Sequence, residues 1–269
     1  MSVALPPIGL GTGPSRGDAG IAFMAHALQL GYRLFDTASH YHNEREVGEA
    51  VRASGVPRDE IVVLTKVWPD MQHAKALRTS SEASLKLLGL DRIDLLVLHW
   101  PNPMVPLAET IGALNAVKAD GLAREIGVSN FPSQMFAQAQ ALSEAPLIVN
   151  EVEYHPFLQQ KAVLAAAEKT GTAVIAHCPL GRVGDLFGEP VVAAAAARLG
   201  RSPAQVVLRW HVQQGLIPIP GTTNRERLAE NFAVFDFALD DGEMADISAL
   251  GERHYRICAP PVPYEWDLV

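Results

Sequence analysis

Short runs of apolar, often β-branched residues recur at nearly regular intervals along the chain, and they predict eight β-strands. Most of these runs are continuously apolar rather than alternating, which is typical of a parallel sheet buried on both faces. The predicted strands are Pro7–Leu10, Leu34–Asp36, Ile61–Val67, Ile93–Leu98, Arg124–Val128, Leu147–Val152, Ala173–Ala176 and Leu216–Ile219.

Segments with the apolar spacing of a helix separate these strands. Among them are Ala74–Leu88, Leu107–Lys118, Gln134–Leu142, Lys161–Lys169, Pro190–Leu199 and Pro203–Gln214. Ser202 before Pro203 predicts a helix cap followed by proline at the first helical position.

Eight strands that alternate with helices predict the α/β class, as a single (β/α)8 TIM barrel over residues 1–269. The alternative is an open, doubly wound sheet. That fold usually has a glycine-rich phosphate turn after its first strand. Gly9–Gly13 imitates such a turn only in part, because no helix follows at once.

The composition narrows the class of protein. Of the 269 residues, 48% are hydrophobic and 19% are charged, which excludes global disorder. Two cysteines exclude a disulfide scaffold and favour a reducing compartment, so we expect a cytoplasmic protein. With 22 basic and 30 acidic residues the net charge is −8, which disfavours nucleic-acid binding. We see no signal peptide in Met1–Thr12 and no apolar run long enough to span a membrane, and we expect a monomer.

Polar side chains follow almost every predicted strand, where a barrel places its active site. Each could by itself be a solvated strand end, but burial of so many charged groups is costly unless they are paired. Their joint placement predicts a site at the carboxyl ends of the strands. The residues are Asp36, Lys66, His99, Ser129, Asn130, Glu151, Glu153 and His177, with Tyr41 five residues beyond Asp36.

Five stretches, in order along the chain, resemble signatures of the aldo-keto reductase family. They are Gly31–Ala38 with Glu44 and Gly48, Leu64–Trp68, Leu98–Pro101, Ile126–Phe131 and Asn150–Pro156. The resemblance continues through Arg227–Asn231 and covers nearly the whole chain. The ending Pro263–Asp267 is most similar to that of the bacterial 2,5-diketo-D-gluconic acid reductases.

The resemblance implies a catalytic tetrad of Asp36, Tyr41, Lys66 and His99. Hydride delivery to a carbonyl carbon builds negative charge on the oxygen, so a proton donor must meet it there. Tyr41 would be that general acid, and the Lys66 cation would lower the pKa of its phenol. Asp36 would anchor Lys66, and His99 would orient the carbonyl.

The resemblance also implies NADPH as the cofactor, with NADH as a second accepted one. The nicotinamide end would contact Ser129, Asn130 and Glu151, where the family usually has glutamine, and would stack on His177. The expected contacts to the phosphates and the adenosine are Leu180, Gly181, Thr222, Arg227, Glu230 and Asn231. Gly221 stands where a lysine is common, so we expect weaker discrimination between NADPH and NADH.

The substrate pocket is expected to involve His40, Trp68 and Trp100, with residues 252–269 as a tail near its mouth. Gly13 stands where the family often has an aromatic residue, so we expect small, polar or varied carbonyl substrates. Examples are keto sugar acids, α-keto esters and aldehydes. Carbonyl reduction and alcohol oxidation both stay open as the physiological direction.

Two other functions compete with this hypothesis. Nine histidines, including His40 and His42, suggest a metal-dependent barrel hydrolase as one alternative. They are scattered along the chain, so we expect no metal site. A non-catalytic NADP(H)-binding regulatory protein could also use the same fold. The complete tetrad argues against that alternative.

Overall fold

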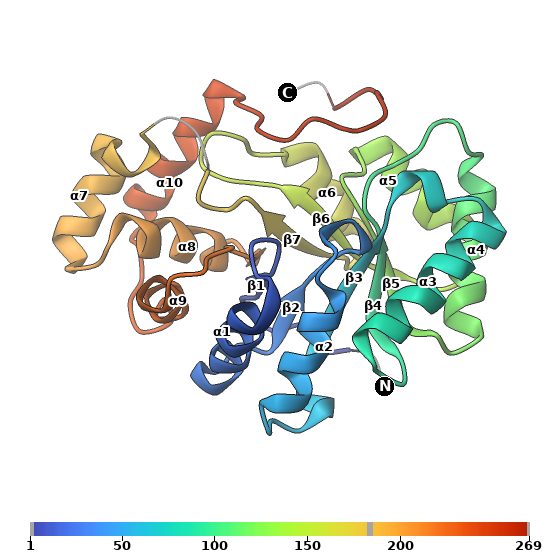
Figure 1. Cartoon of the computed structure of the whole chain (residues 1–269). Helices are drawn as coiled ribbons and strands as arrows, with labels where there is room; N and C mark the ends of the chain where they lie inside the picture. The colour runs from blue at the N-terminus through green and yellow to red at the C-terminus, as the bar shows by residue number, and fades with distance from the viewer. Residues whose placement is uncertain (1–2, 182–184, 268–269) are drawn as a thin grey trace.

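The computed structural model describes residues 3–181 and 185–267, and its centre is one eight-stranded parallel sheet (Figure 1). Each strand pairs with the next one along the chain, in the order β1 to β8. The strands are β1 Leu10–Gly11, β2 Leu34–Asp36, β3 Val62–Val67, β4 Ile93–Leu98, β5 Ala123–Ser129, β6 Leu147–Glu153, β7 Ala173–His177 and β8 Ile217–Pro218.

The two edges of this sheet approach each other through backbone contacts. Gly11 and Gly221 form a parallel bridge, and the Gly9 amide donates to the Pro218 carbonyl at 3.0 Å. The sequential strand order and this contact fit the (β/α)8 fold and exclude the open, doubly wound alternative.

The sequence pattern predicted the first strand too close to the N-terminus. Pro7–Leu10 was predicted, whereas the paired residues are Leu10 and Gly11. The apolar pattern reports burial, and Ile8 is indeed buried. It does not report hydrogen bonding, and Pro7 has no amide hydrogen with which to join a ladder.

Ten α-helices in the described part of the chain surround the sheet. They are α1 Gly17–Leu30, α2 Glu44–Ala53, α3 Ala74–Leu88, α4 Leu107–Ala119, α5 Ser133–Leu142, α6 Lys161–Thr170, α7 Pro190–Leu199, α8 Pro203–Gln213, α9 Arg225–Phe232 and α10 Asp241–Ala249. The predicted cap of α8 is confirmed, because the Ser202 hydroxyl accepts from the Gln205 amide. Gly48 lets α2 meet the end of α3, since a Cβ there would lie 1.8 Å from the Leu88 carbonyl oxygen.

Two apolar clusters form the core. The smaller lies inside the curled sheet and includes Leu34, Leu64, Val97 and Ile175. The larger fills the space between the sheet and the helices. Val3, near the N-terminus, joins the inner cluster. None of the described helices has the length and apolar content that a membrane span requires.

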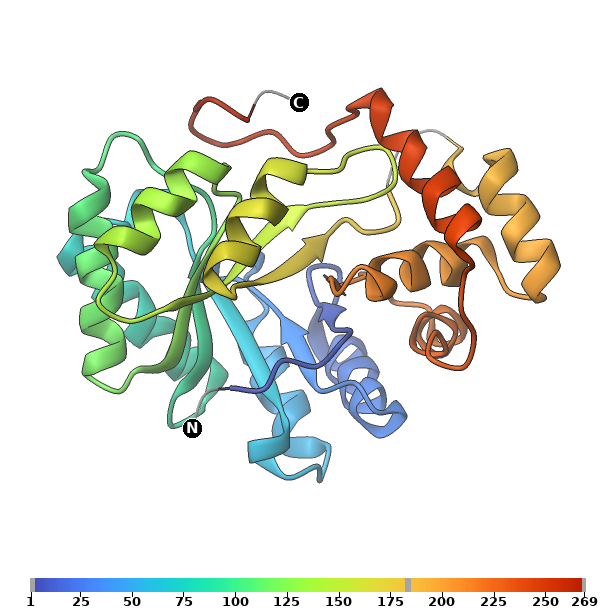
Figure 2. The ribbon, with the colours of Figure 1, turned by 180° about the vertical axis from the view of Figure 1, so that it is seen from behind.

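The C-terminal segment, residues 252–267, runs across the carboxyl ends of the strands (Figure 2). The Tyr255 amide donates to the Phe157 carbonyl at 2.9 Å, and the Tyr264 hydroxyl donates to the Asn130 carbonyl at 2.8 Å. Asp267 accepts from both the amide and the hydroxyl of Ser133, at the start of α5. The last two residues of the predicted tail, 268 and 269, lie outside the described residues.

Candidate active site

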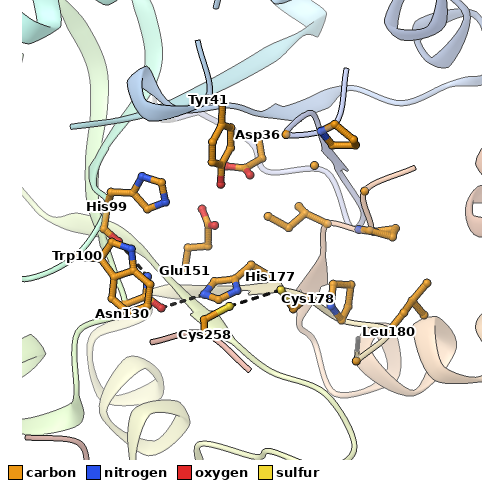
Figure 3. Close-up of a pocket in the computed structure, with 18 residues that line it drawn as sticks. Asp36, Tyr41, His99, Trp100, Asn130, Glu151, His177, Cys178, Leu180 and Cys258 are labelled. Atoms are coloured by element: carbon orange, nitrogen blue, oxygen red, sulfur yellow. Dashed lines mark hydrogen bonds between the residues drawn. The ribbon is translucent and has the colours of Figure 1, made fainter. Parts of the chain in front are cut away.

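A pocket of about 540 Å³ opens at the carboxyl ends of the strands (Figure 3). Its walls come from the residues that end or follow β1, β2, β4, β5, β6, β7 and β8, together with the C-terminal segment. The lining residues are Gly11, Gly13, Pro14, Asp36, Tyr41, His99, Trp100, Asn130, Glu151, His177, Cys178, Pro179, Leu180, Gly181, Ile219, Pro220, Gly221 and Cys258.

A fully buried lysine lies beneath this pocket between two carboxylates. The Lys66 ammonium forms an ion pair with Asp36 and lies 3.3 Å from Glu151 Oε1. It also donates to the Thr37 carbonyl at 3.2 Å. With all three side chains ionised, one cation faces two anions, so the group has a net charge of −1.

This imbalance shifts the pKa values of the group. Burial, and then the nearby charge of Glu151, raise the pKa of Asp36 to about 8 in spite of Lys66. Burial by itself would lower the pKa of Lys66, but Asp36 and Glu151 outweigh it and hold that pKa above its usual value. The lysine is therefore protonated, and the carboxylates compete for it.

Tyr41 follows β2 in a short 3-10 turn, Ser39–Tyr41, and its ring centroid lies 5.2 Å from the Lys66 nitrogen. Burial raises the pKa of Tyr41 overall, while Lys66 lowers it. The sequence-based expectation was a phenol pKa lowered by Lys66. Lys66 does lower the pKa of the phenol, but burial raises it by more. The phenol therefore keeps its proton near neutral pH.

His99 follows β4 and meets the Tyr41 ring edge-on, with ring centroids 5.6 Å apart. Burial, and then Lys66, hold the pKa of His99 well below its usual value, so the imidazole is neutral. Trp68 packs edge-on against His99 at 5.0 Å, and His40 stacks on Trp68 at 3.8 Å. His40 and Trp68 therefore support His99 rather than line the pocket, whereas Trp100 lines it.

Asn130 links three strand ends from a left-handed backbone conformation, φ 62°. Its amide nitrogen donates to the His99 carbonyl at 2.9 Å and to the Ser129 hydroxyl at 3.0 Å. Its amide oxygen is 2.9 Å from His177 Nε2. Ser129 is fully buried behind Asn130 and does not line the pocket.

The residues predicted for the cofactor fall into two groups. Asn130, Glu151, His177, Leu180 and Gly181 line the pocket. The residues predicted for the adenosine end do not line it, because they lie in and before α9; these are Thr222, Arg227, Glu230 and Asn231.

The pocket fits an extended ligand that carries an amide. Glu151 Oε2 is buried and accepts no hydrogen bond within the described residues. Gly11 borders the pocket where a Cβ would lie 2.9 Å from the Ile219 carbonyl oxygen, so only glycine leaves the backbone in place. At α9, Arg225 and Arg227 are exposed near the helix N-terminus, where an anion is stabilised.

Cys178 and Cys258 were missed as pocket residues by the sequence analysis. Cys178 follows His177 directly, so its place at a strand end could have been found. Cys258 comes from the tail, and its sulfur lies 3.8 Å from that of Cys178. No local pattern indicates a contact between residues so far apart in sequence.

The comparisons with known proteins agree with this fold and identify the family. The model of the "Aldo/keto reductase family" matches residues 7–190 and 189–252. The chain is 45% identical over 245 residues to 2,5-diketo-D-gluconic acid reductase B of Corynebacterium sp. (strain SHS752001), covering 90% of this chain and 88% of the relative.

Solved structures give the same result. A putative 2,5-diketo-D-gluconic acid reductase B has a TM-score of 0.94 and 42% identity, covering 98% of this chain and 94% of that one. An aldo-keto reductase from Bombyx mori in complex with NADP has a TM-score of 0.87 and 32% identity, covering 95% and 92%. The protein is an oxidoreductase that acts on carbonyl groups. It belongs to the aldo/keto reductase family.

Proposed function

We propose that this protein reduces small aldehyde or ketone substrates to alcohols with NADPH. The observation that carries the proposal is the convergence on one pocket of Tyr41, its buried neighbour Lys66 and the neutral His99. The complex of a relative with NADP supports the choice of cofactor.

When bound, NADPH would be the source of the hydride that reduces the carbonyl carbon. Tyr41 donates its hydroxyl proton to the carbonyl oxygen, so that the C=O double bond becomes an alcohol and the phenolate is reprotonated from solvent. The Lys66 cation stabilises the developing phenolate, and Asp36 holds Lys66 in place. The neutral His99 ring donates a hydrogen bond that orients the carbonyl.

Several residues of the pocket would hold the cofactor in this proposal. The unpartnered Glu151 Oε2 would accept from the nicotinamide amide, and Asn130 fixes the orientation of the nearby His177 ring. Leu180 and Gly181 would border the pyrophosphate. Thr222 and Arg227, which lie just before and at the start of α9, would hold the 2′-phosphate from outside the pocket.

The proposal is tested with a panel of keto sugar acids, α-keto esters and aldehydes, following NADPH oxidation. A non-catalytic regulatory protein would bind NADPH and turn over no member of the panel. Alcohol oxidation with NADP⁺ on the matching alcohols tests the reverse direction, since the same residues serve both.

We expect a limited preference for NADPH over NADH, below about a thousandfold in kcat/KM, or ~4 kcal/mol. The physical reason is Gly221, which supplies no cation, so that Arg227 provides most of the charge for the 2′-phosphate. Steady-state kinetics with both cofactors give the ratio. Arg227→Ala should lower kcat/KM for NADPH by roughly tenfold or more and leave NADH nearly unchanged. A preference far above a thousandfold would refute this expectation.

Glu151 is expected to bias the site toward the oxidised cofactor. The nicotinamide ring is positively charged in NADP⁺ and neutral in NADPH. Lys66, Asp36 and Glu151 together carry −1 when all three are ionised, above the Asp36 pKa of about 8. Two unit charges ~6 Å apart interact by about 3 kcal/mol at an effective dielectric constant of ~20. Glu151→Gln should therefore weaken NADP⁺ relative to NADPH by at least about tenfold in Kd.

The pH dependence gives a second readout of the same variant. With the pKa of Asp36 at about 8, this carboxyl group holds a proton below that pH, and binding of the cationic ring expels it. The ratio of Kd for NADP⁺ to Kd for NADPH should thus fall as the pH rises from ~6 to ~8 and then level off. In Glu151→Gln the ratio should vary much less. Glu265→Gln removes an exposed carboxylate from the tail and is the control. Equal ratios in wild type and Glu151→Gln would exclude this role of Glu151.

A further inference from the structure

Two sulfur atoms and an imidazole meet at one side of the pocket. His177 and Cys178 are consecutive at the end of β7, and Cys258 comes from the C-terminal segment (Figure 3). One ligand atom from each of these residues lies within 4.8 Å of the other two. All three residues line the pocket and are only partly buried, so an ion can reach them.

The spacing of the two sulfurs fits coordination of one metal ion. A tetrahedral zinc ion with thiolates at about 2.3 Å places its sulfur ligands roughly 3.8 Å apart. Cys178 Sγ and Cys258 Sγ are 3.8 Å apart. The two residues need no rearrangement of the chain to bind the same ion.

The histidine ring is oriented as a metal ligand requires. The Asn130 amide nitrogen is used by His99 and Ser129, so its oxygen faces His177 Nε2 at 2.9 Å. Nε2 therefore donates, and the lone pair of a neutral His177 is on Nδ1. Histidine ligands of metals commonly donate their other ring N–H to an oxygen in this way.

The cysteine from the tail is held by a buried carboxylate. Glu153 accepts from the amides of Ile257 and Cys258, each at 2.7 Å. It also lies 3.1 Å from His155 Nε2. The two amide bonds fix the backbone of Cys258 opposite Cys178.

The negative charge near the cluster favours a bound cation. Glu153 lies beside Cys258, since it accepts from the Cys258 amide at 2.7 Å. A divalent cation replaces the thiol protons and offsets the negative charge of this carboxylate.

We propose that His177, Cys178 and Cys258 bind one soft divalent cation such as Zn²⁺, with its fourth coordination position open to the pocket. Binding forms two metal–sulfur bonds and one metal–nitrogen bond and releases two thiol protons. A bound ion occupies the pocket beside His177, where our proposed function places the nicotinamide. The ion therefore inhibits NADPH-dependent reduction, and this consequence alone depends on the proposed function.

Binding is tested on the full chain, kept reduced and free of cofactor, with Cd²⁺ as the probe. Thiolate coordination gives an ultraviolet charge-transfer band, which we expect to saturate at one Cd²⁺ per chain with release of two protons. Zn²⁺ should displace the band. Cys258→Ser should lose the band and bind Zn²⁺ at least ~100-fold more weakly, whereas His73→Gln, a surface histidine outside the cluster, should match wild type.

Three results would overturn the proposal. The first is no band in the wild-type protein, and the second is an equal band in Cys258→Ser. The third is a wild-type mass lower by two hydrogens under these conditions, which indicates a disulfide. Proton release is measured on the wild-type protein. The test therefore remains decisive even if Cys258→Ser fails to fold. Zn²⁺ should also inhibit carbonyl reduction by wild type reversibly. If no carbonyl is reduced, the Cd²⁺ titration still decides the metal site.

Discussion

Tyr41→Phe is expected to lower kcat for carbonyl reduction by at least ~100-fold, because it removes the proton that meets the developing oxyanion. NADPH binding should persist, since the ring that packs beside Lys66 and His99 is retained. Stopped-flow or steady-state assays of NADPH oxidation measure the loss, and a fluorescence titration measures Kd.

Tyr154→Phe is the matched control for this variant. Tyr154 is also buried, and its hydroxyl donates to Gln214 at 2.9 Å, but it does not line the pocket. Its loss should cost about 1 kcal/mol of stability and leave kcat nearly unchanged. Near-normal turnover by Tyr41→Phe would remove Tyr41 from the mechanism.

Lys66→Met is expected to lower the free energy of unfolding by about 3–5 kcal/mol, the usual cost of breaking a buried ion pair. Methionine fills a similar volume, but it leaves Asp36 and Glu151 buried together without a cation. Activity should fall as well, because the Tyr41 phenolate loses its stabilising charge. Urea denaturation of both proteins gives the difference in stability.

The pH dependence separates lost charge from lost packing. Without Lys66 the folded-state pKa of Asp36 rises further above its unfolded value, so stability declines as the pH rises through that interval. The deficit of Lys66→Met should therefore be larger at pH ~8 than at pH ~5. A deficit that does not change with pH would indicate a packing defect alone. Lys86→Met, an exposed position on α3, should change stability by less than ~0.5 kcal/mol.

The strand ends could be predicted because their signals are local. Asp36 and His177 end strands whose apolar runs are visible in the sequence, and both line the pocket. The predicted Lys66 effect on Tyr41 had the right sign, but burial determines the net pKa. Burial depends on the assembled barrel, so the apolar pattern around Tyr41 does not report it.

The sequence pattern could not predict contacts between segments that are distant along the chain. Tyr264 reaches the Asn130 carbonyl, and Cys258 reaches Cys178, through a tail whose path is set by Glu153. Glu151 was predicted as a cofactor contact, but its approach to Lys66 depends on how β3 and β6 meet across the barrel. Such pairings follow from the closed sheet and not from the spacing of residues along the chain.

The central claim is that the pocket around Tyr41 reduces carbonyls with NADPH. Its most direct test is single-turnover conversion, by the purified protein, of a panel that spans keto sugar acids, α-keto esters and aldehydes. We predict that at least one member yields one alcohol for each NADPH oxidised, and that Tyr41→Phe loses this conversion. The claim would be contradicted if NADPH binds to the protein but no member of the panel causes its oxidation.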